Sequence, residues 1–317
     1  MSKIYEALLR AEIDRIAGLE KSGSAETPAP QSVVPSPPPL NHAQAPMPLT
    51  EQVRNEPASF NAPTSGPLVD LSRVSRHVWI PSAPQLPALE AQGRAVEQFR
   101  SLRSRMHEFR DLNTLRSILV SSGLPSEGKS FVAANLAISI ARHKSSRVLL
   151  IDGDMRRGTL HKLLGTRNAP GLTEFLSGKA SINDVIQQPK AAEVDATVPR
   201  GFSSLSFIPC GADAENAADL SGNGLFDKLL LELYPLFDWI VIDSSPVNMV
   251  SDAVNLARSV DGVLLVTRAE VTKYETAQRA LLELKASKVI GAVLNGVENP
   301  PSVGGYYGYD TYDKMVS

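Results

Sequence analysis

Cysteine is almost absent from this sequence, since Cys210 is the only one among 317 residues. A single cysteine excludes a disulfide framework, and it argues against an iron–sulfur ATPase, which needs several thiolate ligands. It is typical of a protein that works in a reducing compartment. An excess of basic residues is missing too, because 32 lysines and arginines stand against 34 aspartates and glutamates. The charge balance therefore indicates no nucleic-acid partner.

Long apolar runs are also missing. No run approaches the ~20 residues that a membrane-spanning helix needs. The first residues include Glu6, Glu12 and Asp14, which excludes the apolar core of a signal peptide. We therefore expect a cytoplasmic protein. Hydrophobic residues nevertheless make up 43% of the chain, enough for the core of one large domain or two smaller ones.

Two segments precede the part of the chain that we expect to form a globular domain. In residues 1–21, apolar positions such as Ile4, Leu8 and Ile16 approximate the 3.6-residue spacing of an amphipathic helix. Such a helix is either a small surface helix or a docking helix for a partner or a membrane surface. Residues 22–88 hold fourteen of the 23 prolines and few large apolar residues, which predicts a disordered, partly extended linker.

Residues 89–299 alternate between short apolar runs and amphipathic helical stretches. Several runs are apolar throughout, as expected of parallel strands that are buried on both faces. This alternation predicts an α/β fold, with a doubly wound, mostly parallel sheet and helices on both faces. The predicted strands are 117–123, 147–153, 204–211, 238–245, 261–268 and 289–296, and the clearest helices are 130–143 and 274–287. In such folds ligands bind outside the carboxyl ends of the strands.

The first of these strands leads directly into a phosphate-binding motif. Residues 123–130 are GLPSEGKS, a full G-x-x-x-x-G-K-S between a strand and a helix. The glycines let successive backbone N–H groups turn toward phosphate oxygens. Lys129 can reach the β- and γ-phosphates, Ser130 can bind Mg²⁺, and the helix start adds its positive end. The predicted nucleotide-binding residues here are Gly123, Glu127, Gly128, Lys129, Ser130 and Phe131.

Carboxylates end two later strands. Asp152 and Asp154 follow one apolar run in VLLIDGDMRR, and Asp243 follows another in IVIDSSP. Any one of them alone would be explained as a helix N-cap or a turn residue. Because all three are predicted at the edge that carries the phosphate motif, they are suited to holding hydrated Mg²⁺, and Asp154 to accepting a proton from an attacking hydroxyl. The predicted metal ligands are Ser130, Asp152 and Asp243, and the predicted catalytic residues are Lys129, Asp152, Asp154 and Asp243.

Together, GLPSEGKS, LLIDGDMRR and IVIDSSP resemble the bacterial tyrosine kinases of capsule and exopolysaccharide synthesis, over about residues 90–312. Those are P-loop enzymes unrelated to the eukaryotic protein kinases, and their second acidic motif has the form apolar-D-x-D-x-R. The resemblance implies a P-loop NTPase fold, ATP and Mg²⁺ as cofactors, and phosphoryl transfer to tyrosine. It also implies that Asn295 contacts adenine, although by position alone Asn295 is an ordinary strand-end turn residue.

Two further segments gain a role through this resemblance. VEQFRSLRSRM places Glu97, Arg100 and Arg103 along one helix face, which on its own indicates only a solvated surface. In the family, an E-x-x-R-x-x-R element at this place helps to form a ring of subunits. Clustered C-terminal tyrosines of the family are phosphorylated, chiefly by neighbouring subunits. The matching acceptors in the tail 300–317 are Tyr306, Tyr307, Tyr309 and Tyr312, four of the seven tyrosines.

The predicted topology would make this tail accessible to an active site. If the last strand is parallel to the P-loop strand, the tail leaves the sheet at the nucleotide edge. The 13 residues from Asn299 to Tyr312 can span up to ~45 Å, which brings a neighbour's catalytic site within reach. Gly304, Gly305 and Gly308 predict a segment flexible enough to enter a cleft.

Three positions depart from the family pattern. Ser126 replaces the glycine that usually precedes the glutamate of the loop, and Ser245 replaces the first proline of D-[ST]-P-P. Gly158 stands where proline commonly follows the arginine pair. None of these changes removes a predicted catalytic group. Serine resists backbone conformations that glycine tolerates, so Ser126 is expected to alter how closely the loop approaches the phosphates.

The resemblance favours an autophosphorylating tyrosine kinase that regulates exopolysaccharide polymerisation, export or chain length. It implies a homo-oligomeric ring, a separate membrane polysaccharide co-polymerase as activator, a tyrosine phosphatase, and a place at the inner face of the cytoplasmic membrane through the co-polymerase. The N-terminal MSKIYEALLRAE resembles the opening of stand-alone members of the group.

Two alternatives remain open on the sequence. The first is a non-kinase ATPase switch resembling the plasmid-partition and septum-site proteins. That reading leaves the tyrosine tail and the helix around Arg100 unexplained, and it would prefer an early lysine where Ser121 and Ser122 stand. The second is an inactive structural component of the polysaccharide machinery, which the changes at Ser126 and Ser245 keep open.

Overall fold

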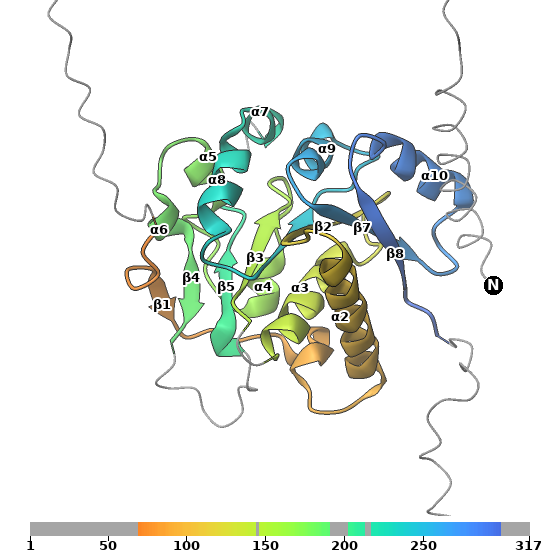
Figure 1. The fold of residues 1–317 in the computed structure, drawn as a ribbon, viewed down its shortest axis with the longest axis horizontal. Coiled ribbons are helices and arrows are strands. Elements are labelled where there is room, and N and C mark those ends of the chain that lie inside the picture. The colour runs from red at the N-terminus through yellow and green to blue at the C-terminus, as the bar shows by residue number, and fades with distance from the viewer. Residues whose placement is uncertain (1–68, 144–145, 191–201, 213–216, 299–317) are drawn as a thin grey trace, which may run out of the picture. The chain divides into compact units, whose positions relative to one another are not determined.

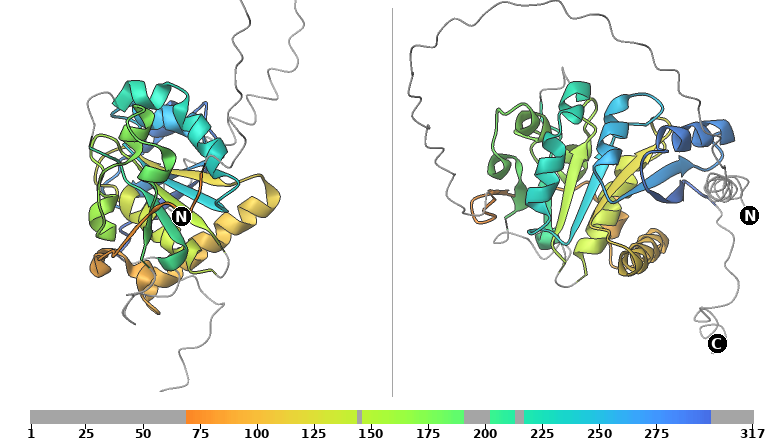
Figure 2. Two further views of the ribbon diagram at one scale, coloured as in Figure 1. Left: turned by 90° about the vertical axis from the view of Figure 1, so that its left-hand side faces the viewer. Right: turned by 45° about the horizontal axis from the view of Figure 1, so that its top comes forward.

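The computed structural model describes residues 69–143, 146–190, 202–212 and 217–298. Within these ranges an eight-stranded sheet forms the centre of the domain, and helices cover both of its faces (Figure 1, Figure 2). The strand order is β1-β4-β5-β3-β6-β2-β7-β8, and every neighbouring pair is parallel except β4 with β5. The predicted doubly wound, mostly parallel α/β fold is therefore confirmed.

The six predicted strands are all present, each with ends within three residues of the prediction. The strands are β1 (Ser75–His77), β2 (Ser117–Ser122), β3 (Val148–Gly153), β4 (Gln187–Pro189), β5 (Leu205–Ile208), β6 (Trp239–Ser244), β7 (Gly262–Arg268) and β8 (Val289–Asn295). The α-helices are α2 (Arg94–Leu112), α3 (Lys129–Ala141), α4 (Leu160–Leu164), α5 (Leu172–Leu176), α6 (Ile182–Val185), α7 (Ala217–Gly222), α8 (Leu225–Leu233), α9 (Ser251–Arg258) and α10 (Tyr274–Glu283). Short 3₁₀ turns are η1 (Ala83–Gln85), η2 (Pro87–Leu89) and η4 (Phe202–Ser204).

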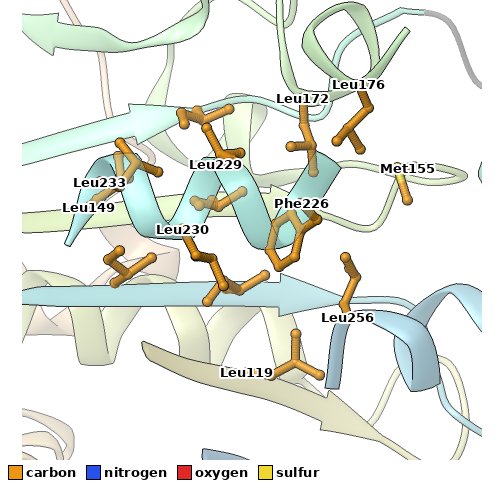
Figure 3. Close-up of a cluster of buried hydrophobic side chains, with 14 of the residues drawn as sticks. Leu119, Leu149, Met155, Leu172, Leu176, Phe226, Leu229, Leu230, Leu233 and Leu256 are labelled. Carbon is orange, nitrogen blue, oxygen red and sulfur yellow. The ribbon is translucent and has the colours of Figure 1, made fainter. Parts of the chain in front are cut away.

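Separate helix layers bury the two faces of the sheet. On one face lies α3, which is buried at every position from 132 to 141, together with α2 and the segment before it. On the other face lie α8, α9 and α10. Figure 3 shows the apolar side of α8 against the sheet, formed by Phe226, Leu229, Leu230 and Leu233. Their i, i+3, i+4, i+7 spacing places all four side chains on one side of a helix.

The folded domain begins earlier than the sequence indicates. Residues 69–88 are assigned to the linker 22–88 by their proline content, yet Trp79 is only 5% exposed and Leu86 is fully buried. Prolines occupy the second position of η1 and the first position of η2, where a missing N–H and a fixed φ angle are tolerated. The apolar side chains between the prolines therefore supply the burial that the linker prediction overlooked, and the boundary at 88 lies inside the domain.

Strands β1 and β4 are not predicted by the sequence. Each has three residues, SRH and QQP, and neither has the apolar character or alternation of a recognisable strand. The predicted helix 1–21, the linker up to residue 68 and the tail 300–317 with its four tyrosines lie outside the described residues. Within the described ranges, no helix combines the length and apolar character needed to cross a membrane.

Candidate active site at the carboxyl edge of the sheet

The P-loop lies between β2 and α3, at the carboxyl edge of the sheet, as the motif predicts. Gly128, directly before α3, has a left-handed φ of 95°, and an added Cβ would lie 2.0 Å from Nδ2 of Asn295. At Gly123 an added Cβ would lie 3.1 Å from Nδ2 of Asn248. Gly128 is therefore required both by its backbone angle and by its close neighbour.

Lys129 lies at the centre of the predicted acidic residues. Its ammonium Nζ is 2.9 Å from Oδ2 of Asp154 and 3.7 Å from Oδ1 of Asp243, and it donates to the Ser130 hydroxyl at 3.2 Å. Burial lowers the pKa of Lys129, but the two carboxylates outweigh burial and hold the pKa above its ordinary value. The lysine is therefore a charged group that an arriving phosphate would share with Asp154.

Asp152 and Asp243 lie side by side, because β3 and β6 pair these two residues in register. Both side chains are fully buried, and Asp152 accepts the backbone N–H of Leu160 at 3.0 Å. Burial, followed by repulsion from Asp243, raises the pKa of Asp152 to about 8. Burial also raises the pKa of Asp243, to about 6, although Lys129 acts in the opposite direction. This pair therefore favours a bound proton or a bound cation.

Asp243 has the environment expected of a ligand to a cation. Both of its carboxylate oxygens are buried without a hydrogen-bond partner. Such a group is costly unless a proton or a cation satisfies it. Across the described ranges, no three His, Cys, Asp or Glu side chains gather into a metal site of their own. Because Mg²⁺ is commonly held by one or two carboxylates together with substrate phosphates, Asp243 fits a magnesium ion that arrives with a nucleotide.

Asp154 is held on both of its carboxylate oxygens. Lys129 contacts Oδ2, while Oδ1 accepts the Ser245 hydroxyl at 2.8 Å and the Arg157 backbone N–H at 3.1 Å. Burial raises the pKa of Asp154, but Lys129 and these donors outweigh burial and lower the pKa below its ordinary value. Asp154 is therefore ionised, as a proton acceptor must be. The sequence gives no signal for Ser245 as part of the site, since the family pattern has proline there.

Glu127 joins the P-loop to the loop after β7. Its buried carboxylate accepts the Leu124 backbone N–H at 2.7 Å and also the Thr272 hydroxyl. The side chain of Asn295 donates to the Glu127 carbonyl at 3.0 Å. Both predicted nucleotide-binding residues thus brace the loop in this structure, and nucleotide contact stays a prediction for each. Thr272 lies in a loop without a motif, so the sequence does not identify it.

Phe131 lies where α3 meets α2, and α2 also carries the three residues predicted as oligomer contacts, Glu97, Arg100 and Arg103. The Phe131 ring packs against the ring of Phe99 in α2, and the two ring centroids are 5.7 Å apart. Glu97 and Arg100 form an exposed ion pair, whereas Arg103 donates to the Ser139 carbonyl of α3 at 2.8 Å. Arg103 therefore anchors α2 within its own chain. Glu97 and Arg100 are more exposed, although Arg100 also donates to the Ala91 carbonyl at 3.0 Å. Their place in a subunit ring stays a prediction, as does nucleotide contact by Phe131.

Two departures from the family pattern have a local explanation. Ser126 has a left-handed φ of 65°, and its carbonyl accepts Nη1 of Arg268 at 3.1 Å. The backbone there has the geometry for which glycine is usual. At Gly158 an added Cβ would lie 2.3 Å from the Cβ of Cys210, so Cys210 occupies the space that a larger side chain at position 158 would need. Burial raises the pKa of Cys210 to about 12, which keeps the thiol neutral.

Comparison with known proteins identifies the family, although no protein-family model matches the chain. Putative tyrosine-protein kinase CapB of Staphylococcus aureus is 32% identical over 218 residues, which are 68% of this chain and 90% of CapB. The solved kinase domain of the Escherichia coli tyrosine kinase ETK is 31% identical with a TM-score of 0.63, over 76% of this chain and 89% of that domain. The chain belongs to this family of bacterial tyrosine-protein kinases, which are P-loop ATP-binding proteins.

Longer relatives extend well beyond the shared part. Tyrosine-protein kinase Wzc of Salmonella typhimurium is 33% identical over 223 residues, which are 69% of this chain but only 29% of Wzc. The chain thus spans less than a third of the length of that relative. The shared fold and P-loop site belong to the family, and the wider activity of Wzc is a separate question.

Proposed function

We propose that this chain is an ATP-dependent protein-tyrosine autokinase whose subunits phosphorylate one another's C-terminal tyrosines. The observation that carries the proposal is the position of Lys129 between the ionised Asp154 and the buried carboxylate of Asp243, whose oxygens accept no hydrogen bond from the described residues. This arrangement offers a cation for phosphates, a ligand for a metal ion and an acceptor for a proton. Phosphoryl transfer to a hydroxyl requires these groups in position more than it requires covalent help.

Each residue has a defined task in this proposal. The backbone of the P-loop and Lys129 hold the phosphates of ATP, and Lys129 exchanges part of its contact with Asp154 for them. Ser130, Asp152 and Asp243 would hold Mg²⁺, which would supply positive charge to neutralise the phosphate oxygens. Asp154 takes the phenolic proton as attack begins, because a tyrosine with its ordinary pKa of ~10 carries that proton at neutral pH.

The proposed acceptors are the tail tyrosines Tyr306, Tyr307, Tyr309 and Tyr312. β8 is parallel to β7 and β7 is parallel to β2, so all three strands end at one edge. Asn295, the last residue of β8, contacts the P-loop carbonyl of Glu127. The chain therefore continues toward its tail from beside the phosphate site, which supports the tail as substrate. In the proposal a second subunit supplies the tail, within a ring to which Glu97, Arg100 and Arg103 contribute.

The cellular setting of the proposal rests on the family resemblance. The kinase would regulate exopolysaccharide polymerisation, export or chain length. A membrane polysaccharide co-polymerase would activate it at the inner face of the cytoplasmic membrane, and a tyrosine phosphatase would reverse the modification. Each phosphate adds about −1.5 to −2 charges at neutral pH, so several on one tail would repel each other and loosen a ring.

Incubation with Mg·ATP, followed by mass-spectrometric mapping of phosphotyrosine, tests the proposal. Lys129→Met removes the cation that holds the phosphates and is expected to lower labelling at least ~100-fold. Lys162→Met, at an exposed position of α4, is the matched control and should label like the wild type. Equal labelling of the Lys129→Met protein would contradict the proposal. ATP hydrolysis without phosphotyrosine would indicate an ATPase switch, and neither reaction would indicate an inactive structural component.

A further inference from the structure

Ser245 follows β6 directly, and its peptide group is held by two neighbouring strands. The side chain is 3% exposed. Its carbonyl accepts the hydroxyl of Ser121, at the end of β2, at 3.0 Å, and lies 3.1 Å from the hydroxyl of Ser244 in β6. Ser121 and Ser244 are themselves fully buried. The orientation of the Ser245 backbone is thus fixed before any ligand arrives, and with it the direction of the Cα–Cβ bond that carries the hydroxyl.

That hydroxyl points at Asp154. Ser245 donates to Oδ1 of Asp154 at 2.8 Å, and the same oxygen accepts the backbone N–H of Arg157 at 3.1 Å. The other oxygen, Oδ2, faces the ammonium of Lys129 at 2.9 Å. The carboxylate is therefore oriented by two side chains, one on each oxygen, and by one backbone group.

A bound nucleotide acts unequally on these two side chains. Lys129 is the P-loop cation that phosphates attract, so its hold on Oδ2 weakens when they arrive. The hydrogen bond from Ser245 goes to Oδ1 and does not depend on the lysine. Of the side-chain donors that the described structure places on Asp154, Ser245 is the one that remains.

We infer that Ser245 is a positioning residue, which keeps the carboxylate of Asp154 in place for the acceptor hydroxyl once Lys129 has turned to the phosphates. The inference rests on the proposed kinase function. Proline, the residue that the family pattern has at this position, carries no hydroxyl and cannot make this bond. Serine in place of proline at position 245 thus adds a buried hydrogen-bond donor to the site. Ser121 supports this donor by holding the backbone carbonyl of Ser245.

Two substitutions at this position separate the hydroxyl from the shape of the side chain. Ser245→Ala removes the donor, and Ser245→Thr retains it. We expect Ser245→Ala to lower kcat for tail phosphorylation about tenfold, since a positioned base contributes 10²- to 10⁴-fold and here it is loosened rather than removed. KM for ATP should stay within about twofold, because the phosphate-binding groups are intact, and Ser245→Thr should recover most of kcat. Ser206→Ala, which removes another buried hydroxyl from β5, is the matched control and should keep wild-type kinetics.

A crystal structure of the Ser245→Ala protein with Mg²⁺ and a non-hydrolysable ATP analogue, compared with the same complex of the wild type, supplies a second measurement that does not depend on activity. Because Lys129 is then engaged by the phosphates, rotation of the Asp154 carboxylate away from its wild-type orientation supports the inference. The inference is overturned if the carboxylate stays in place, if kcat is unchanged, or if Ser245→Thr is as slow as Ser245→Ala while the wild type labels its tail. Absence of phosphotyrosine from the wild type itself would instead overturn the kinase function, and the positioning role with it.

Discussion

Ser126 holds the P-loop in a backbone conformation that glycine adopts without strain. Its φ of 65° is left-handed, and Glu270, in the loop after β7, has a similar φ of 60°. A side chain in this region costs roughly 1–2 kcal/mol, partly offset because glycine gains more entropy on unfolding. We therefore expect Ser126→Gly and Glu270→Gly each to raise the free energy of unfolding by about 0.5–1 kcal/mol in urea titrations. Gly128→Ala should lower it, because its added Cβ meets Asn295. A fall in stability for both glycine variants would contradict this account.

The buried acid pair predicts how stability responds to pH in the nucleotide-free protein. The pKa values of Asp152 and Asp243 in the folded state, about 8 and about 6, lie above the ordinary value of 3.8. The folded state thus retains protons that the unfolded state releases, so the stabilisation is present below pH 4 and is lost as pH rises to about 8. Between pH 6 and 8 the loss is due mainly to Asp152, which contributes at most about 1.4 kcal/mol per pH unit, while Asp243 adds to it near pH 6.

Urea titrations in EDTA at several pH values between 6 and 8 measure this slope. Asp152→Asn should flatten it, because the amide does not titrate. Asp184→Asn is the control, since hydrogen bonds from Ser181 lower the pKa of Asp184, and it is ionised across this range. An identical slope in the wild type and the Asp152→Asn protein would show that another group is responsible.

At the level of elements, the strands that could be predicted most directly from the sequence are those that helices bury on both faces of the sheet. The strands β2, β3 and β6 are apolar runs that are buried along their whole length, and their sequences indicate strands directly. β1 and β4 are three-residue polar segments whose pairing depends on neighbours that they meet only in the folded chain. Proline content led to a domain boundary predicted too late, at residue 88. Average composition does not reveal that a few large apolar side chains between the prolines are buried.

Two truncations test that boundary. The unit that contains the sheet begins at Leu68. A chain that starts at residue 69 should keep the thermal stability of the full-length protein, since every described buried side chain is retained. A chain that starts at residue 89 loses Trp79 and Leu86 from the core, and we expect it to lose several kcal/mol of unfolding free energy or to aggregate. Equal melting temperatures for the two truncations would mean that residues 69–88 contribute nothing to the domain.

At the level of the whole molecule, strand order assembles a site from distant parts of the sequence. Asp152 and Asp243 meet because β3 and β6 are neighbours, and Lys129 joins them because β2 is next to β6. Parallel strands share their carboxyl edge, so this convergence could be predicted from the sequence. The contacts of Ser245 with Asp154 and of Glu127 with Thr272 could not, since they depend on how the loops after four strands, β2, β3, β6 and β7, fit together.

The same topology predicts the source of the phosphorylated tail. A mixture of two variants tests this source. One variant carries Lys129→Met and an intact tail, and the other keeps Lys129 but ends before Gly304, so neither can label its own tail tyrosines. A tail that leaves β8 beside the P-loop can span up to ~45 Å and reach another subunit. We expect the mixture to label the Lys129→Met chain at its tail tyrosines, with an initial rate that rises with protein concentration, because two chains must meet. Mass spectrometry distinguishes the two chains by length. Two results together would show that each tail is modified by its own subunit. The mixture would contain no phosphotyrosine, and the wild type would label at a rate per molecule that does not change with protein concentration.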